Sequence, residues 1–148
     1  MKPSAHVAVS TVVSGSAFLI TNSIPLTVTS WLAGIFIDLD HVVDYLREYG
    51  FRLSPSHFLE TFYHTRYKRV WLLFHGWEVM ILLAAISYFT AWDPFTTGIL
   101  IGCTHHLICD QFTNHASLPT YSLIWRLIKR FRVRETFPRL FGGREGKP

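Results

Sequence analysis

Apolar residues dominate four stretches of the chain, which polar residues separate: 6–21, 25–45, 70–92 and 95–112. Residues 25–45 and 70–92 are long enough, as helices, to cross a hydrocarbon core of about 30 Å. The first stretch is shorter but rich in Ser, Gly and Ala, which suit close helix packing in membranes. Pro25 is placed to open the second helix, and Asp93-Pro94 to end the third. The pattern predicts four transmembrane helices.

The pattern changes after residue 117. Apolar residues then recur at helical spacing with cations between them: Ile124, Leu127, Ile128 and Phe131 alternate with Arg126, Lys129, Arg130 and Arg134. Basic amphipathic helices of this kind lie on anionic membrane surfaces. We therefore predict an all-α fold of one domain, residues 1–148: an integral membrane bundle of four transmembrane helices plus a C-terminal interfacial helix within 118–141.

The composition agrees with this class of protein. Hydrophobic residues make up 49% of the chain and charged residues only 16%, against about 25% charged in soluble domains. The net charge of +4 would suit nucleic acid, but the placement of the cations favours a lipid surface, so nucleic acid is not an expected partner. Cys103 and Cys109 lie too far apart along a helix for a disulfide, and we interpret them as packing residues.

The positions of the 14 Lys and Arg residues predict the topology. All of them fall at the N-terminus, within 46–69 or after residue 112, and none lies in the connections at 22–24 and around Asp93. Short cytoplasmic loops carry such an excess of cations. We expect a multi-pass protein of the inner (cytoplasmic) membrane with both termini in the cytoplasm.

Ionisable residues interrupt all four apolar stretches. The second stretch carries Asp38, Asp40, His41 and Asp44 near its end. The third carries His75 and Glu78, the fourth carries His106 and Asp110, and the first begins with His6. In the predicted topology all of them lie at one depth, near the cytoplasmic face. Ionisable groups at membrane depth are costly and usually functional, so we expect them to meet in one site.

Histidines with several carboxylates are ligands for zinc, or for manganese and iron where carboxylates dominate. A divalent metal, zinc first, is therefore the expected cofactor. The predicted ligands are His6, Asp38, Asp40, His41, His75, Glu78, His106 and Asp110. Asp44 and Glu78 are the candidate catalytic carboxylates, because a spare carboxylate can act as a general base. His105 projects from a different helical face and is expected to pack or to support a ligand.

Four short blocks resemble a bacterial family in their order along the chain: Ala5-His-Val-Ala-Val-Ser10, Ile37-Asp-Leu-Asp-His41, Phe74-His75 and Gly102-x-x-x-His106-x-x-x-Asp110. The family is that of inner-membrane metal-dependent hydrolases described as LexA-regulated or LexA-binding. The blocks are more distantly similar to zinc-dependent phospholipase C. The resemblance implies hydrolysis of a phosphoester or ester bond. Two positions depart from it: Ile37 stands where proline is frequent, and Glu78 or His64 replaces a second histidine.

Two other functions compete with a membrane hydrolase. A b-type cytochrome would hold haem between histidines of facing helices, but haem does not need the carboxylates. A proton or metal-ion carrier would use the same residues as a relay, but would require polar groups that continue to the far side. Membrane lipids and a lipid-like substrate are the expected partners.

Overall fold

The computed structural model describes residues 3–51, 54–64, 67–114 and 116–138, without the side chains of 62–64. These residues form helices and loops, apart from one isolated bridge between Arg69 and Arg132, which confirms the all-α prediction. The elements are α1 Pro3–Thr21, α2 Ile24–Phe36, α3 Leu39–Tyr49, α4 Pro55–His64, α5 Trp77–Phe89, α6 Pro94–Thr113, the 3-10 helix η1 Leu118–Tyr121, α7 Leu123–Ile128 and α8 Val133–Thr136.

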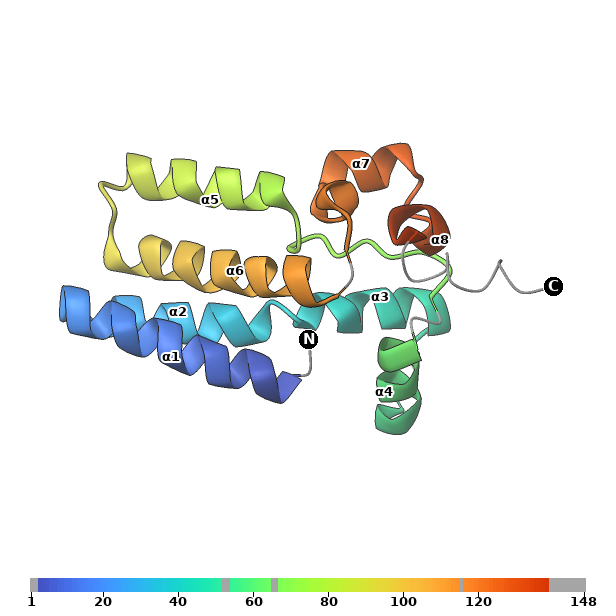
Figure 1. The fold of residues 1–148 in the computed structure, drawn as a ribbon, viewed down its shortest axis with the longest axis horizontal. Coiled ribbons are helices and arrows are strands. Elements are labelled where there is room, and N and C mark those ends of the chain that lie inside the picture. Colours follow the sequence, from blue (N-terminus) through green and yellow to red (C-terminus); the bar gives the residue numbers. More distant parts are fainter. Residues whose placement is uncertain (1–2, 52–53, 65–66, 115, 139–148) are drawn as a thin grey trace.

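Helices α1, α2, α5 and α6 lie side by side, and α3 continues in the direction of α2 (Figure 1). Helix α6 packs most extensively on α2, and also contacts α1 and α5. The start of α1, the end of α2, the start of α5 and the end of α6 all lie at the same end of this bundle, where α3 begins. The topology thus brings together the parts of the four helices where ionisable residues occur.

Side-chain caps and prolines set the starts of α2 and α6. Ser23 caps α2 by accepting a hydrogen bond from Leu26 N at 3.4 Å, with Pro25 in the first turn. Asp93 caps α6 by accepting from Phe95 N at 2.9 Å, with Pro94 following it. Each proline occupies a position whose backbone N–H would lack a helical partner anyway, so both helices begin close to where the sequence places them.

The contacts of α6 with its neighbours are made by small residues. A Cβ atom on Gly102 would lie 2.9 Å from Gly34 N, and one on Gly98 would lie 2.5 Å from Leu26 O. The α1–α2 contact includes a hydrogen bond from Ser14 to Ser30 at 3.0 Å. Large apolar side chains point outward instead, among them Val12, Leu19, Ile20, Val28, Ile81, Leu82, Phe89, Phe95 and Phe112. Small residues inside and large apolar ones outside are typical of helices packed in lipid.

Within the described residues, two helices are long and apolar enough to cross a membrane: Pro3–Thr21, and Ile24–Tyr49 with a turn at residues 37 and 38. The third predicted helix, 70–92, is much shorter, because residues 70–76 form a loop and α5 has 13 residues. At 1.5 Å per residue, α5 is only about 20 Å long. Four complete membrane crossings therefore remain a prediction.

The single interfacial helix predicted within 118–141 is wrong in detail, because η1, α7 and α8 replace it, and 139–141 lie outside the described residues. Arg130 and Phe131 adopt positive φ angles of 52° and 59°, which end α7. Arg126, expected among the outer cations, is fully buried, whereas the apolar Ile124, Leu127 and Ile128 are exposed. Helix α7 thus turns its arginine inward and its apolar side outward.

Candidate metal centre

Four of the predicted ligands converge at the α3 end of the bundle. Asp38, His75, His106 and Asp110 each offer one ligand atom, and these atoms all lie within 4.8 Å of one another. His75, His106 and Asp110 are buried, whereas the Asp38 side chain is 25% exposed. The four residues come from the α2–α3 turn, the loop before α5 and the last turns of α6, so the site joins three parts of the chain. This group could hold a metal ion.

A hydrogen bond to α2 fixes the orientation of His106. Its Nδ1 lies 2.7 Å from the carbonyl oxygen of Gly34. A carbonyl only accepts, so Nδ1 is the protonated nitrogen of the neutral ring. Nε2 then carries a lone pair, and it lies 3.3 Å from Asp38 Oδ1 and 3.6 Å from Asp110 Oδ2.

His75 is oriented in the same way by a carboxylate. Its Nδ1 lies 3.3 Å from Asp40 Oδ2, and that oxygen also accepts a hydrogen bond from Phe74 N at 2.6 Å. Its Nε2 is directed at the group, 3.5 Å from Asp38 Oδ1 and 4.0 Å from Asp110 Oδ2. Metal-binding histidines usually donate their second ring N–H to a carboxylate or a carbonyl. Here Asp40 supplies the carboxylate for His75, and Gly34 supplies the carbonyl for His106.

The Nε2 atoms of His75 and His106 face each other at 3.4 Å. When both rings are neutral with Nδ1 protonated, the two Nε2 lone pairs and the carboxylate oxygens of Asp38 and Asp110 repel one another. A shared proton would link only two of these atoms, whereas a divalent cation is attracted to all four and balances the charge of the two carboxylates. The arrangement therefore suits a metal ion.

Two further predicted ligands lie beside the group. His6 Nε2 is 3.1 Å from Asp110 Oδ1, whereas His106 approaches the other oxygen of that carboxylate, and the His6 ring stacks on the His106 ring with centroids 3.8 Å apart. His41 Nε2 lies 3.7 Å from Asp38 Oδ1. Asp38 precedes α3 without using its carboxylate as a cap, which leaves the carboxylate directed at the histidines.

Asp40 and Asp44 stand one turn apart on α3, and their carboxylates hold the loop before α5. Asp44 Oδ2 accepts hydrogen bonds from Trp71 N at 2.8 Å and Leu72 N at 3.1 Å. Leu72 has a φ of 44°, a left-handed conformation that costs an ordinary residue roughly 1–2 kcal/mol. The two carboxylates therefore stabilise a strained loop whose last residues include His75.

Glu78 lies outside the group of four. Its carboxylate accepts hydrogen bonds from Ser122 Oγ at 2.5 Å, Leu123 N at 2.8 Å and Ile124 N at 3.2 Å. The sequence paired His75 with Glu78 within the third predicted helix, 70–92, but α5 begins only after Gly76. His75 is consequently not helical, and Glu78 is directed at the start of α7.

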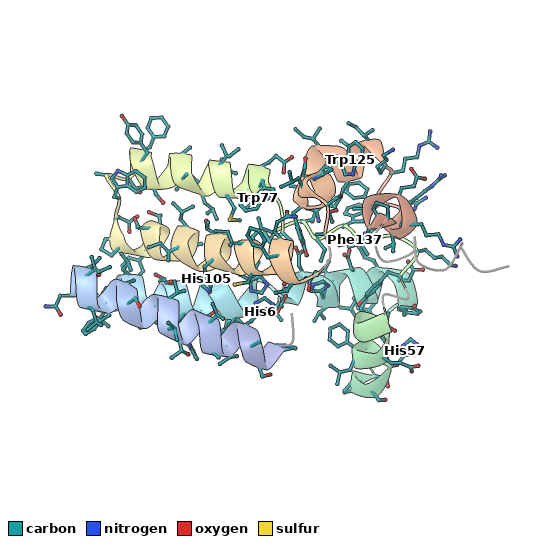
Figure 2. The ribbon with its side chains drawn as sticks, viewed as in Figure 1. His6, His57, Trp77, His105, Trp125 and Phe137 are labelled. Carbon is teal, nitrogen blue, oxygen red and sulfur yellow. The ribbon has the colours of Figure 1, made fainter. Side chains whose placement is uncertain are left out.

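The remaining histidines differ from the ligands in their surroundings. His105 Nε2 lies 2.9 Å from Ser10 Oγ and its Nδ1 3.0 Å from Ile101 O, so it joins α1 to α6, in agreement with a packing role. Figure 2 shows His6 and His105 along the contact of α1 with α6, and His57 apart from them on α4. The side chain of His64 lies outside the described residues.

Sequence reasoning missed Gly34 and Arg126. Gly34 contributes a carbonyl oxygen, which no side-chain pattern reveals. Arg126 donates from Nη2 to the His75 carbonyl at 2.6 Å and from Nη1 to the Leu72 carbonyl at 2.9 Å. Burial lowers the pKa of Arg126 to about 10, so the guanidinium is protonated at neutral pH. The one sequence signal for it was an arginine within an otherwise apolar helical turn.

Comparisons of the chain with protein-family models, with curated proteins and with solved structures found no match.

Proposed function

We propose that this protein is an integral membrane hydrolase that uses a divalent metal, and that it belongs with the inner-membrane metal-dependent hydrolases whose motifs it resembles. The observation that supports this most is the convergence of four ligand atoms, from Asp38, His75, His106 and Asp110. In its neutral form, with Nδ1 bonded to Gly34 O or Asp40, each histidine directs the lone pair of Nε2 at the other ligand atoms.

Zinc is the proposed ion. In a tetrahedral site with bonds of about 2.0–2.1 Å, neighbouring ligand atoms lie about 3.3–3.4 Å apart. The distances from His106 Nε2 to its three neighbours are 3.3, 3.4 and 3.6 Å, and His75 Nε2 lies 3.5 Å from Asp38 Oδ1. His75 Nε2 and Asp110 Oδ2 are 4.0 Å apart, so these two atoms would have to approach each other for zinc to bind. Two nitrogens with two oxygens also fit its preference for mixed ligands.

Four protein ligands fill a tetrahedral site, so the ion would have to expand to five ligands to bind a water. It would then lower the pKa of that water to about 7 and polarise a phosphoryl or carbonyl oxygen. Asp38 is the exposed member of the group, so we propose that substrate and water approach on its side. His41, next to Asp38, would take up the proton released from the attacking water. We propose His41 for this step in place of Asp44 and Glu78, whose carboxylates are bonded to backbone N–H groups elsewhere.

The membrane is the proposed location and a lipid ester or phosphoester the proposed substrate class. Two helices are long and apolar enough to span, and large apolar side chains point outward from all four bundle helices. The positive-inside rule puts the α3 end of the bundle at the cytoplasmic face. On this proposal a lipid headgroup in the cytoplasmic leaflet would reach the metal from the side of Asp38.

Hydrolysis in mixed micelles tests this function. Detergent-purified protein would be assayed on a phospholipid, a diacylglycerol and a chromogenic phosphodiester, first as isolated, then after chelation, and then after zinc is added back. We expect cleavage of at least one ester class, loss of cleavage on chelation and recovery with zinc. The His106→Ala variant should be inactive and His105→Ala active. Cleavage that survives chelation and the His106→Ala substitution would rule the function out.

A further inference from the structure

His75 lies in a loop, whereas His106 and Asp110 lie on α6 and Asp38 lies in the short turn between α2 and α3. The loop of His75, residues 70–76, includes the left-handed Leu72. Strained backbone persists only where the surrounding structure determines it strongly. The carboxylates of α3 hold one side of this loop through Trp71, Leu72 and Phe74. The other side of the loop must be held by something else.

Arg126 occupies that other side. Its guanidinium donates to the carbonyl oxygens of Leu72 at 2.9 Å and His75 at 2.6 Å, and its Nε donates to Ser122 O at 3.4 Å. Leu72 O also accepts from His75 N at 3.1 Å. The planar guanidinium thus bridges the two ends of the turn from Leu72 to His75 and fixes the distance between their carbonyl oxygens.

The burial of Arg126 is not explained by packing alone. The side chain is fully buried, and within the described part of the chain its hydrogen bonds all go to backbone carbonyls. Burying a charge is costly unless its hydrogen bonds are satisfied, and methionine would fill similar space without that cost. What arginine adds is several directed donors in a rigid plane.

We propose that Arg126 is a positioning residue for the metal centre: from α7 it holds the backbone of His75, so that Nε2 of that ring stays directed at His106, Asp38 and Asp110. This inference rests on the proposed metal-binding function. It also assigns a role to α7, which becomes the support of a metal ligand as well as a surface helix. Glu78 and Ser122 fix the start of the same helix, so Arg126 acts from an anchored element.

Binding of Co²⁺ to the full-length protein in detergent tests the proposal. Affinity would be measured by competition with a chromophoric chelator for the parent, Arg126→Met, Arg126→Lys and Arg130→Met. Arg130 is an exposed arginine one turn further along, so its variant is a matched control. The d–d absorption of bound Co²⁺ at saturation would be recorded for each protein, because it reports ligand geometry independently of affinity.

We expect about 10–100-fold weaker binding for Arg126→Met, the range for groups that orient metal ligands, and an altered d–d spectrum at saturation. Arg126→Lys keeps the charge and some of the hydrogen-bond donors, so its affinity for Co²⁺ should lie between those of Arg126→Met and the parent. Arg130→Met should match the parent. If Arg126→Met does not fold, the affinity and d–d spectrum of Arg126→Lys are compared with those of the parent instead. Parental affinity and spectrum in the folded Arg126 variants would overturn this inference alone, whereas a parent protein that binds no Co²⁺ would overturn the metal centre as well.

Discussion

His75 and His106 direct their Nε2 atoms at each other across 3.4 Å, while the opposite nitrogen of each ring lies beside an acceptor, Asp40 for one and Gly34 for the other. In the neutral rings with Nδ1 protonated, both Nε2 atoms are acceptors, which cannot bond to each other but can both bind a cation. Two carboxylates add negative charge at the same point. The protein thus supplies both ligands and the groups that orient them, and the following predictions separate these roles.

Asp40 is predicted to support the metal rather than bind it. Asp40→Ala removes the acceptor of the His75 N–H and of Phe74 N, so His75 can turn while all four ligands remain. We expect zinc affinity to fall about 10–100-fold, measured by chelator competition, with one ion still bound at saturation. Asp93→Ala, which removes a carboxylate at the start of α6, should not change the affinity. Complete loss of zinc in Asp40→Ala would instead indicate a ligand.

His6 offers a test of how many ions bind. It contacts Asp110 Oδ1, whereas His106 approaches Oδ2, and its ring stacks on that of His106, which in our account orients both. The His6→Phe substitution keeps the stacking and removes the hydrogen bond. We expect about 10-fold weaker zinc binding with the number of ions per chain unchanged at one, by elemental analysis. A decrease from two ions to one would show that His6 binds a second metal.

Glu78→Gln should separate the anchoring of α7 from metal binding. The carboxylate accepts hydrogen bonds from Ser122, Leu123 and Ile124, and an amide accepts them more weakly. We expect faster tryptic cleavage after Lys129 and Arg130, followed by mass spectrometry, and an unchanged zinc content. Loss of zinc from the folded variant would return Glu78 to the ligand set that the sequence predicts.

The close approach of α2 and α6 predicts that Gly102 cannot be enlarged. An added Cβ would lie 2.9 Å from Gly34 N and 2.8 Å from the Ala33 Cβ, so the helices must move apart and the Gly34–His106 hydrogen bond must lengthen. Gly102→Ala should destabilise the protein by about 1–3 kcal/mol in thermal unfolding and reduce its zinc content. Gly15→Ala, with nothing within 4 Å of the new atom, is the control and should be neutral or stabilising.

Local signals predicted much of the fold and site, and long-range contacts account for most of what was missed. Pro25 marked the start of α2, and Asp93-Pro94, expected to end the third helix, lies at the boundary before α6. His106 and Asp110, paired in the sequence, both lie in the last turns of α6. The start of α5 was misplaced because the apolar run beginning at Val70 suited a helix equally well. The backbone of residues 70–76 is held instead by two long-range hydrogen bonds. Trp71 N donates to Asp44, 27 positions away, and Arg126 donates to the Leu72 carbonyl, 54 positions away. No periodicity within the run reveals those contacts.

The central claim is that Asp38, His75, His106 and Asp110 form one metal centre, and elemental analysis of the detergent-purified protein tests it most directly. Parent, His106→Ala and His105→Ala would be purified identically and loaded with equal zinc. His105 adjoins His106 in α6 but is bonded to Ser10, so the two substitutions differ chiefly in the proposed centre. We predict one zinc per chain for the parent and for His105→Ala, and none for His106→Ala. Equal zinc in parent and His106→Ala, or none in the parent, would contradict the account.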